Sequence, residues 1–224
     1  AAEANDAATK VTLNSFDALN ITKVTSSNLG GILDVLDTSS VDGSATDTFA
    51  KIQAIVDAYV AVFAHADGES SRDDGPTMDQ YALLGVTGVN DTEQLKLLNQ
   101  VIDVQSSSGV DTVAKLQAYV DAVTALMSAA AGDGSEVSLA QLELLEIGNI
   151  DAGNLSAVQA AIAASNDDGT GVDTYGELRL IATAPAATLD LRDASEFKLN
   201  LIQPIVTQDG KLYYYLDING EGSS

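Results

Sequence analysis

The sequence predicts a mainly α-helical protein in which three tandem three-helix repeat units precede a short C-terminal β-hairpin. Three observations support this fold class. The sequence repeats itself with a period of about 60–65 residues, which lies in the range of small helical modules. Apolar residues inside each copy recur at helical spacing. After Pro185 the pattern changes to alternating apolar residues, which is typical of strands.

The internal repeat is visible in two segments of each copy. The first segment, residues 12–24, aligns with residues 77–89 and 138–150. Its apolar positions correspond in all three copies: Phe16, Tyr81 and Leu142; Leu19, Leu84 and Leu145; Ile21, Val86 and Ile147; Val24, Val89 and Ile150. The second segment, residues 47–58, aligns with residues 111–122, and a weaker third copy opens at Asp173.

These alignments set the domain organisation. We place helical repeat units at residues 11–76, 77–136 and 137–189, of which the third is divergent. Residues 190–224 form a separate tail, which we expect to be a β-hairpin and the start of a further domain. Because three short helices cannot bury their apolar stripes alone, we expect each unit to pack against the next.

Each unit is predicted to begin with a short helix. Thr77 stands three residues before Gln80, and Ser138 stands three residues before Gln141. This spacing is typical of a capping box, in which the two side chains satisfy backbone N–H groups at the start of a helix. Thr12 begins a degraded version of the same motif in the first unit.

Two longer helices follow in each unit. Apolar residues of the second helix share one face: Leu29, Ile32, Leu33 and Leu36 in the first unit; Leu95, Leu98, Val101 and Ile102 in the second; Leu155, Val158 and Ile162 in the third. The third helix carries a similar stripe: Phe49, Ile52, Val56, Tyr59 and Phe63, then Val113, Leu116, Val120, Val123 and Met127. We expect Asp47, Asp111 and Asp173 to be the N-caps of these third helices.

The tail is predicted to contain two strands. Residues 197–202 and 212–216 favour strand, and the turn signal at residues 207–210 lies between them. A hairpin alone is marginal in water, so it should pack on the helices or belong to a further domain.

Composition excludes several functional classes. The chain has 10 Lys and Arg against 33 Asp and Glu, a net charge of −23, and it has no Cys. This charge would repel a nucleic-acid backbone, so we expect no nucleic-acid partner. No apolar run reaches about 18 residues, so no membrane insertion is expected. Thiol chemistry and disulfides are impossible without Cys. The chain does not begin with Met, so we expect a processed product or a fragment, and we expect it to be a monomer.

Catalytic residues are not expected. His65 is the only histidine and falls near the end of a predicted helix, where the helix dipole favours a structural or solvent-facing role. An enzyme would require a deep pocket that gathers His65 with two acids and a hydroxyl group. No nucleophile-elbow pattern supports such a site, and we predict that the chain is not an enzyme.

Calcium is the one cofactor that the sequence suggests. Asp217, Asn219 and Glu221 place oxygen ligands at positions one, three and five of a loop with glycine at position six. This is the first half of an Asp-rich calcium loop. The acid of position twelve would fall beyond Ser224, so a tight turn is the competing interpretation. Calcium bound at acidic positions would also reduce the self-repulsion of the chain.

The repeat motifs carry a resemblance. The stretch at residues 83–89, the junction at residues 109–112 and the helix at residues 115–122 resemble repeat segments of very large bacterial surface proteins, including giant adhesin-like proteins. The resemblance covers residues 11–185. It implies a non-enzymatic structural spacer at the bacterial cell surface or in a secreted protein, which projects a neighbouring domain that binds a protein or glycan.

A binding module is the alternative hypothesis. In it, a groove between units captures a peptide or glycan with the assistance of calcium. A concave patch lined by Tyr59, Tyr81 and Tyr119 would favour this alternative, and convex polar faces would favour the spacer.

Overall fold

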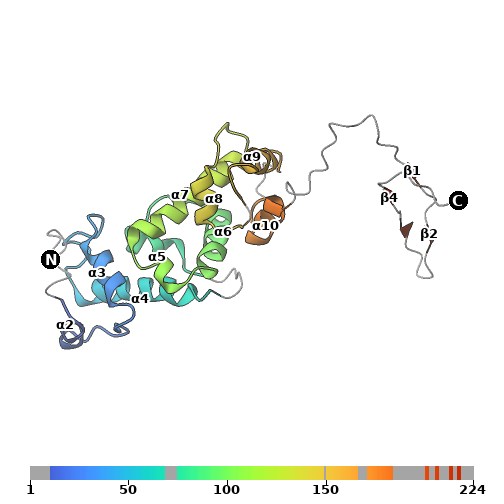
Figure 1. Ribbon diagram of the computed structural model, residues 1–224. Helices are drawn as coiled ribbons and strands as arrows, with labels where there is room; N and C mark the ends of the chain where they lie inside the picture. Colours follow the sequence, from blue (N-terminus) through green and yellow to red (C-terminus); the bar gives the residue numbers. More distant parts are fainter. Residues whose placement is uncertain are drawn as a thin grey trace. The chain divides into compact units, whose positions relative to one another are not determined.

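A computed structural model describes residues 11–68, 75–148, 150–165 and 171–183, together with eight strand residues between 200 and 217. The chain divides into two compact units, residues 1–186 and 187–224, which are considered separately. Where the structure describes the first unit, its regular structure is helical, as the sequence predicted (Figure 1).

Nine α-helices lie in the described part of the first unit and are grouped here into three triplets in chain order. The first triplet is α2 (Leu13–Ala18), α3 (Leu29–Asp37) and α4 (Phe49–His65). The second triplet is α5 (Met78–Leu83), α6 (Thr92–Asp103) and α7 (Val113–Ala130), with a 3₁₀ turn, η1 (Ser107–Gly109), before α7. The third triplet is α8 (Leu139–Leu144), α9 (Leu155–Ala163) and α10 (Tyr175–Thr183).

The short helices begin at capping boxes, which confirms the sequence prediction. The Gln80 N–H donates to Thr77 Oγ1 at 3.2 Å, and the Thr77 N–H donates to Gln80 Oε1 at 2.8 Å. Ser138 and Gln141 make the same reciprocal pair. Each short helix then ends before a residue in the left-handed region, with φ of 55°, 80° and 53° at Asn20, Gly85 and Glu146. That conformation turns the chain sharply after six helical residues.

The N-caps of the third helix in each triplet differ from the prediction by one residue. Thr48 Oγ1 accepts from the Lys51 N–H, and Thr112 Oγ1 accepts from the Lys115 N–H, both at 3.3 Å. The predicted caps Asp47 and Asp111 precede these threonines and instead form exposed ion pairs with the same lysines. In the third triplet Thr174, and not Asp173, accepts from the Glu177 N–H. A cap must stand three residues before the donor it satisfies, and threonine holds that position in each triplet.

In each of the first two triplets, one glutamine of the longest helix holds the loop between the first and second helices. Gln53 Oε1 accepts from the Thr22 N–H at 2.8 Å, and Gln53 Nε2 donates to the Thr22 carbonyl at 3.3 Å. Gln117 makes the same two bonds to Thr87, at 2.9 and 3.0 Å. Each carboxamide thus satisfies both the backbone N–H and the backbone carbonyl of one exposed threonine, Thr22 or Thr87. Equivalent residues of the aligned sequence segments therefore make equivalent contacts.

The apolar stripes predicted for the second and third helices form most of one continuous core. The largest side chains that are fully buried come from all three triplets: Tyr59, Tyr81, Ile32, Ile55, Leu84, Leu97, Leu98, Ile102, Leu116, Leu126, Leu142 and Leu145. Phe49 departs from the prediction, because 61% of its surface is exposed.

Consecutive triplets pack through corresponding helices. At the first junction, between the first and second triplets, α4 packs on α5 and α6, and α3 meets α7. At the second junction, between the second and third triplets, α7 packs on α8 and α9, and α6 meets α10. Figure 1 shows α2 and α3 at one end of the helical unit and α9 and α10 at the other, with α4 and α7 between them.

The second unit contains four described strands of two residues each. β1 (Asn200–Leu201) pairs antiparallel with β4 (Leu216–Asp217), and β2 (Ile205–Val206) pairs antiparallel with β3 (Leu212–Tyr213). The predicted turn at residues 207–210 lies outside the described residues, and the hairpin stays a prediction.

Candidate functional site

The first junction encloses a cluster of polar side chains, formed by His65, Tyr81, Asn99 and Asp103. His65 is the last residue of α4 and faces α6, which carries Asn99 and Asp103 one turn apart. Each of the four residues is 6% exposed or less. The placement of His65 at the C-terminal end of a helix agrees with the sequence prediction, and of the two roles predicted for it the structure supports the structural one.

Asn99 satisfies three neighbours at once. The Tyr81 hydroxyl donates to Asn99 Oδ1 at 3.0 Å, and Asn99 Nδ2 donates to the Pro76 carbonyl at 3.1 Å. The Asn99 carbonyl lies 2.9 Å from His65 Nε2. Burial raises the pKa of Tyr81 far above its ordinary value, so its hydroxyl keeps its proton and remains a donor. This asparagine therefore ties α4, α5 and the chain before α5 to α6.

Asp103 completes the cluster on the other side of the histidine. Its Oδ1 lies 3.9 Å from His65 Nδ1, and its side chain is fully buried. The Asp103 carbonyl also accepts from the Gly68 N–H at 3.0 Å, which fixes the chain as it leaves α4. The His65 and Asp103 side chains are both buried, and the cluster links the end of α4 to α5 and α6.

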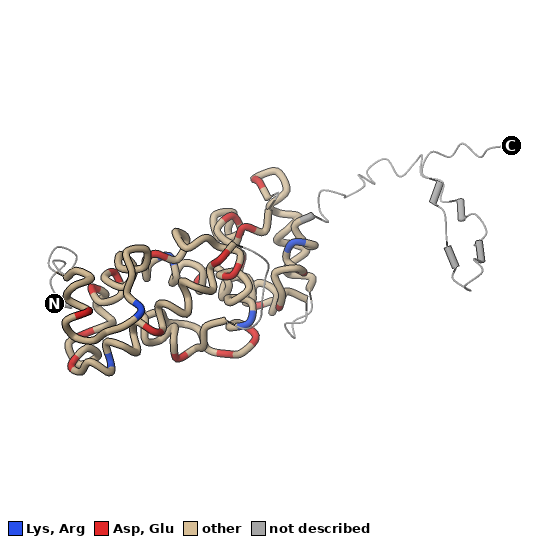
Figure 2. The backbone as a smooth tube through the Cα atoms, turned by 90° about the horizontal axis from the view of Figure 1, so that it is seen from below, with Lys and Arg blue, Asp and Glu red and all other residues tan. Residues whose placement is uncertain are grey.

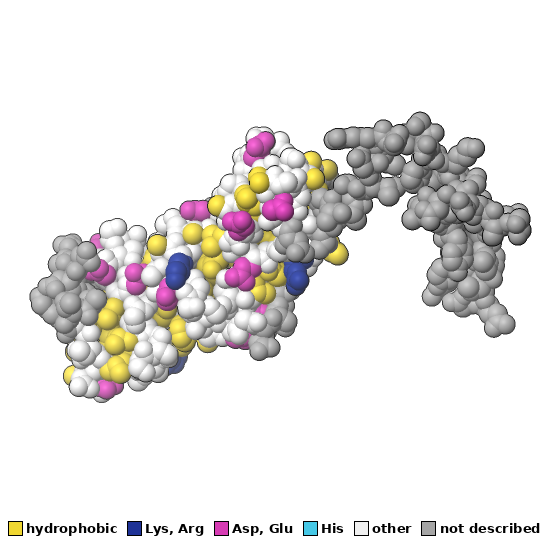
Figure 3. All heavy atoms as spheres, in the orientation of Figure 1, with side chains coloured by type: hydrophobic (Ala, Val, Ile, Leu, Met, Phe, Trp, Pro, Cys, Tyr) yellow, Lys and Arg dark blue, Asp and Glu magenta, His cyan; other side chains and the backbone are white. Residues whose placement is uncertain are grey.

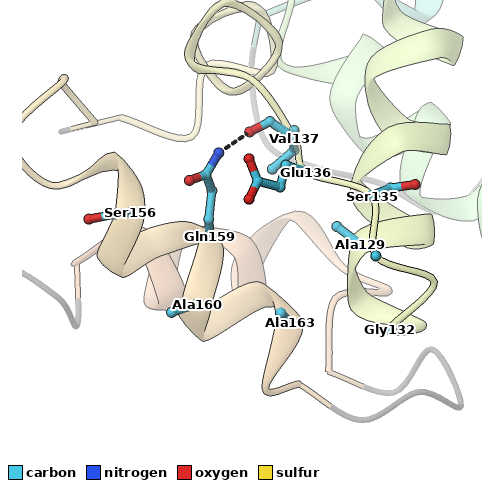
Figure 4. Close-up of a pocket in the computed structure, with 10 residues that line it drawn as sticks. Ala129, Gly132, Ser135, Glu136, Val137, Ser156, Gln159, Ala160 and Ala163 are labelled. Atoms are coloured by element: carbon cyan, nitrogen blue, oxygen red, sulfur yellow. Dashed lines mark hydrogen bonds between the residues drawn. The ribbon is translucent and has the colours of Figure 1, made fainter.

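The second junction has an open pocket at the corresponding place. The pocket measures about 440 Å³ and lies between the C-terminal end of α7, the chain that follows it, and α9 (Figure 4). The sequence alignment places Ala129, Leu142, Gln159 and Ala163 where the first junction has His65, Tyr81, Asn99 and Asp103. Two of the large polar side chains are thus reduced to methyl groups, and the space they would fill remains open.

The pocket has a counterpart of one hydrogen bond of the polar cluster. Gln159 Nε2 donates to the Val137 carbonyl at 2.8 Å, as Asn99 donates to the Pro76 carbonyl. Figure 4 shows Glu136 beside Gln159, with its carboxylate facing the pocket. The remaining lining is small, from Gly132, Ser135, Ser156, Ala160 and other residues. The pocket therefore combines a lining of mostly small residues with two polar side chains, Glu136 and Gln159, that lie side by side.

Four tyrosines are buried and resist ionisation. Burial, followed by the charges of Asp111 and Asp34, raises the pKa of Tyr59 to about 12. Burial is also the largest cause that raises the pKa of Tyr81, Tyr119 and Tyr175. The concave patch of Tyr59, Tyr81 and Tyr119 is not formed, because these side chains are at most 4% exposed. Their hydroxyls instead donate to groups inside the protein.

Two hydrogen bonds that the sequence analysis missed cross the junctions. Asp34 Oδ2, on α3, accepts from the Val113 N–H at 2.6 Å. Gln100 Oε1, on α6, accepts from the Tyr175 N–H at 2.8 Å. In both cases the donor is the first residue of the third helix in the next triplet, where backbone N–H groups have no partner within the helix. The signal in the sequence is clear only for Asp34, a charged residue inside an apolar stretch of α3; Gln100 follows another polar residue, Asn99, on α6.

The predicted calcium ligands fall in the second unit. Asp217 belongs to β4, while Asn219 and Glu221 lie outside the described residues. Within the described residues no group of three or more His, Asp or Glu side chains could hold a metal ion. The calcium site stays a prediction, which calorimetric titration of the whole chain with calcium tests.

Charge is spread along the helical unit. Figure 2 shows Asp and Glu at many places on the backbone and Lys and Arg at few, and Figure 3 shows acids scattered between apolar and neutral side chains. No helix within the described residues is both long and apolar enough to cross a bilayer. Searches against protein-family models, curated proteins and solved structures found no match.

Proposed function

We propose that residues 11–189 are three tandem repeat modules, 11–76, 77–136 and 137–189, which act as a non-enzymatic structural spacer. The observation that carries this proposal is the recurrence of one junction hydrogen bond. Asp34 and Gln100 occupy corresponding positions of successive second helices, and each accepts from the first N–H of the third helix in the next module. A contact repeated at the same positions sets the same relation between neighbours.

A spacer must keep its modules in fixed positions, and the junctions have the features that this requires. At the first junction α4 packs on α5 and α6, and Leu84, directly after α5, and Leu97, on α6, are fully buried. Burial of apolar surface contributes about 25 cal/mol per Å², so each junction resists opening. A net charge of −23 keeps the exposed faces of such a segment soluble and disfavours self-association.

The location of the spacer rests on the sequence resemblance alone. We propose a bacterial cell-surface or secreted adhesin-like protein, in which the neighbouring domain binds a protein or glycan. The modules themselves supply distance and orientation. The His65 cluster and the pocket at the second junction are compatible with this role, because the first joins two modules from within and the second is lined mostly by small side chains.

Distance measurements between spin labels test the rigidity of the array. The chain has no Cys, so two cysteines introduced by Asn14→Cys on α2 and Glu143→Cys on α8 would carry the only labels. Both positions are exposed. Pulsed electron paramagnetic resonance should give one narrow distance distribution between the first and third modules. A control pair within the first module, Asn14→Cys and Ala64→Cys, gives the width due to the labels themselves.

A broad or multiple distribution for the long pair, beside a narrow one for the control pair, would contradict the spacer proposal. The presentation role has its own test. A binding domain displayed on cells through residues 11–189 should capture large immobilised targets better than one displayed through a Gly/Ser linker of equal residue number. Such a linker behaves as a flexible coil and has no fixed direction. Equal capture would count against the role.

A further inference from the structure

The first module exposes apolar side chains whose aligned counterparts in the second and third modules are buried. Leu19 is 39% exposed, whereas the aligned Leu84 and Leu145 are fully buried. Phe49, the first residue of α4, is 61% exposed, whereas the first residues of α7 and α10, Val113 and Tyr175, are 8% and 6% exposed. The same repeat positions are therefore buried in the second and third modules and exposed in the first.

Two further apolar positions are also more exposed in the first module than in the other two. Leu36 and Ile52 are only partly buried. Their counterparts in the second and third modules are at most 1% exposed: Ile102 and Leu116, then Ile162 and Leu178. We call the surface formed by Leu19, Leu36, Phe49 and Ile52 the open face. It lies at the α2 end of the helical unit, where apolar side chains gather in Figure 3.

The open face is hollowed. One hollow of about 360 Å³ lies between the end of α2 and the start of α4, and is lined by Leu19, Phe49 and Gln53 among others. A second, of about 320 Å³, is lined by Phe16, Leu19, Leu36 and Ile52 among others. Both are lined mostly by apolar side chains, with Leu19 between them. An occupant that covers both must therefore present a broad apolar ridge rather than a single side chain.

The two junctions show what kind of group fits such a surface. In the second module α4 covers α5 and α6, and α3 supplies the Asp34 carboxylate to the first N–H of α7. In the third module α7 covers α8 and α9, and α6 supplies the Gln100 carboxamide to the first N–H of α10. The corresponding donor on the open face is the Phe49 N–H, and the described residues supply no acceptor for it.

We infer that the open face is a docking surface for one more helical module of the same kind. The long third helix of that module covers Leu19 and the two hollows. Its second helix brings a carboxylate or carboxamide to the Phe49 N–H. This inference rests on the proposed stacking of modules and continues the pattern of the two existing junctions by one step.

A tandem duplication supplies the occupant in a form that the chain already contains. Residues 12–76 are duplicated, so that an outer copy of the first module precedes the inner one through its own linker. The chain has no Trp, so Phe49→Trp placed in one copy at a time gives a single fluorescent reporter. Trp in the inner copy should emit at shorter wavelength, and acrylamide should quench it several-fold less than Trp in the outer copy.

The outer copy is the matched control, because its open face remains uncovered in the same protein. Equal quenching of the two reporters would overturn the inference. Protection of the Phe49→Trp reporter in the unduplicated chain that increases with protein concentration would also overturn it, because a second copy of the chain would then be the occupant. Protection that is independent of concentration and lost on deletion of residues 1–10 would assign the face to those residues instead.

This outcome is separable from failure of the spacer proposal. If the labelled pair on α2 and α8 gives a narrow distance distribution but the inner Trp remains exposed, the modules stack and the open face accepts no further one. If the distance distribution is broad and the inner Trp is exposed, the stacking itself fails. Near-native circular dichroism of the duplicated chain, with helical signal increased in proportion to length, shows that the added module has folded.

Discussion

The two junctions of the helical unit are built on the same helices but are filled differently. At the first, His65, Tyr81, Asn99 and Asp103 form an enclosed polar cluster. At the second, Ala129, Leu142, Gln159 and Ala163 occupy the aligned positions and leave a pocket of about 440 Å³. The apolar residues around these positions are buried in both cases, so the helices meet in the same way whether the space between them is polar or open.

The difference separates two roles of a junction. Apolar burial holds the helices together and tolerates a vacant space at the edge. A buried polar cluster adds a requirement for geometry, because each donor and acceptor must meet its partner or lose free energy. The first junction should therefore be the more sensitive to single substitutions, and the second the more tolerant. Four predictions test this contrast.

Alkaline pH should have the largest effect, because it acts on several buried tyrosines together. The pKa of Tyr59 is raised from 10.0 to about 12, and those of Tyr81, Tyr119 and Tyr175 are raised as well. The folded chain thus keeps phenolic protons at a pH where the unfolded chain loses them. The stability that these hydroxyls contribute is fully present below pH 10 and is lost as the pH rises through 12 and beyond.

At the first junction this loss includes the contribution of Tyr81, which has leucine as its counterpart at the second junction. Tyr81→Phe should make the decline in the free energy of unfolding above pH 10 shallower. Tyr175→Phe, at the second junction, is the control and should change the slope less. Urea unfolding followed by circular dichroism at a series of pH values measures both. Equal slopes for the two variants would mean that the buried cluster has no special role in alkaline stability.

Removal of the central amide of the cluster should have the next largest effect. Asn99→Leu leaves the Tyr81 hydroxyl and the Pro76 carbonyl buried without their partner. Each such group costs about 1–3 kcal/mol, so we expect a loss of about 2–4 kcal/mol in the free energy of unfolding. Gln159→Leu, the matched variant at the second junction, removes one bond beside an open pocket and should cost less than about 1 kcal/mol.

A double variant sharpens the same comparison. Asn99→Leu with Tyr81→Phe removes the hydroxyl that the single variant leaves without a partner, so part of the loss should be recovered. Recovery of this kind measures the coupling between the two residues. If Asn99→Leu and Gln159→Leu destabilise the chain equally, the contrast between the junctions does not exist in energetic terms.

Much of the helical framework could be predicted from the sequence, because it depends on local signals. The capping boxes at Thr77 and Ser138 were confirmed, as was the burial of most apolar stripe positions. Local reasoning failed by one residue at Asp47 and Asp111, where a neighbouring threonine has the geometry that the cap requires. An aspartate and a threonine in succession are both good N-caps, and only the position of the first helical residue decides between them.

The candidate sites were less predictable, because they depend on contacts between distant segments. His65 was expected in a structural or solvent-facing role, and only the packing of α6 on α4 encloses it. Phe49 fits its apolar stripe, yet it is exposed because the stripe extends to a face that no described element covers. The bond from Val113 to Asp34 joins residues 79 positions apart. Periodicity cannot reveal such a pair, although the polar residue in an apolar helix was visible.

The side chains that accept the hydrogen bonds across the two junctions differ in charge, and this difference gives a third prediction. Asp34 offers a carboxylate to the N-terminus of α7, whereas Gln100 offers a neutral amide to that of α10. Asp34→Asn retains an acceptor but loses the attraction between a negative charge and the helix dipole. We expect a loss of about 0.5–1 kcal/mol at low salt, which becomes smaller at high salt.

Asp17→Asn is the control for this substitution, because Asp17 is an exposed aspartate on α2. It should leave the free energy of unfolding nearly unchanged at either salt concentration. Urea unfolding in low and high sodium chloride compares the two variants. A loss at Asp34 that does not depend on salt would assign the effect to geometry rather than charge, and the two junctions would then be equivalent in this respect.

The smallest effect is expected from filling the pocket at the second junction. Ala163 lines that pocket from α9, so Ala163→Leu places an isobutyl group in the space that the first junction fills with Asp103 (Figure 4). Partial burial of this group should raise the free energy of unfolding by about 0.5 kcal/mol. Ala64→Leu, on an exposed position near the end of α4, controls for helix propensity and should have no such effect. Because leucine adds no polar group, a gain at Ala163 alone would show that the second junction lacks volume rather than hydrogen bonds. Destabilisation by Ala163→Leu would instead mean that the pocket cannot accept a side chain, and that its small residues are required for the helices to meet as closely as they do.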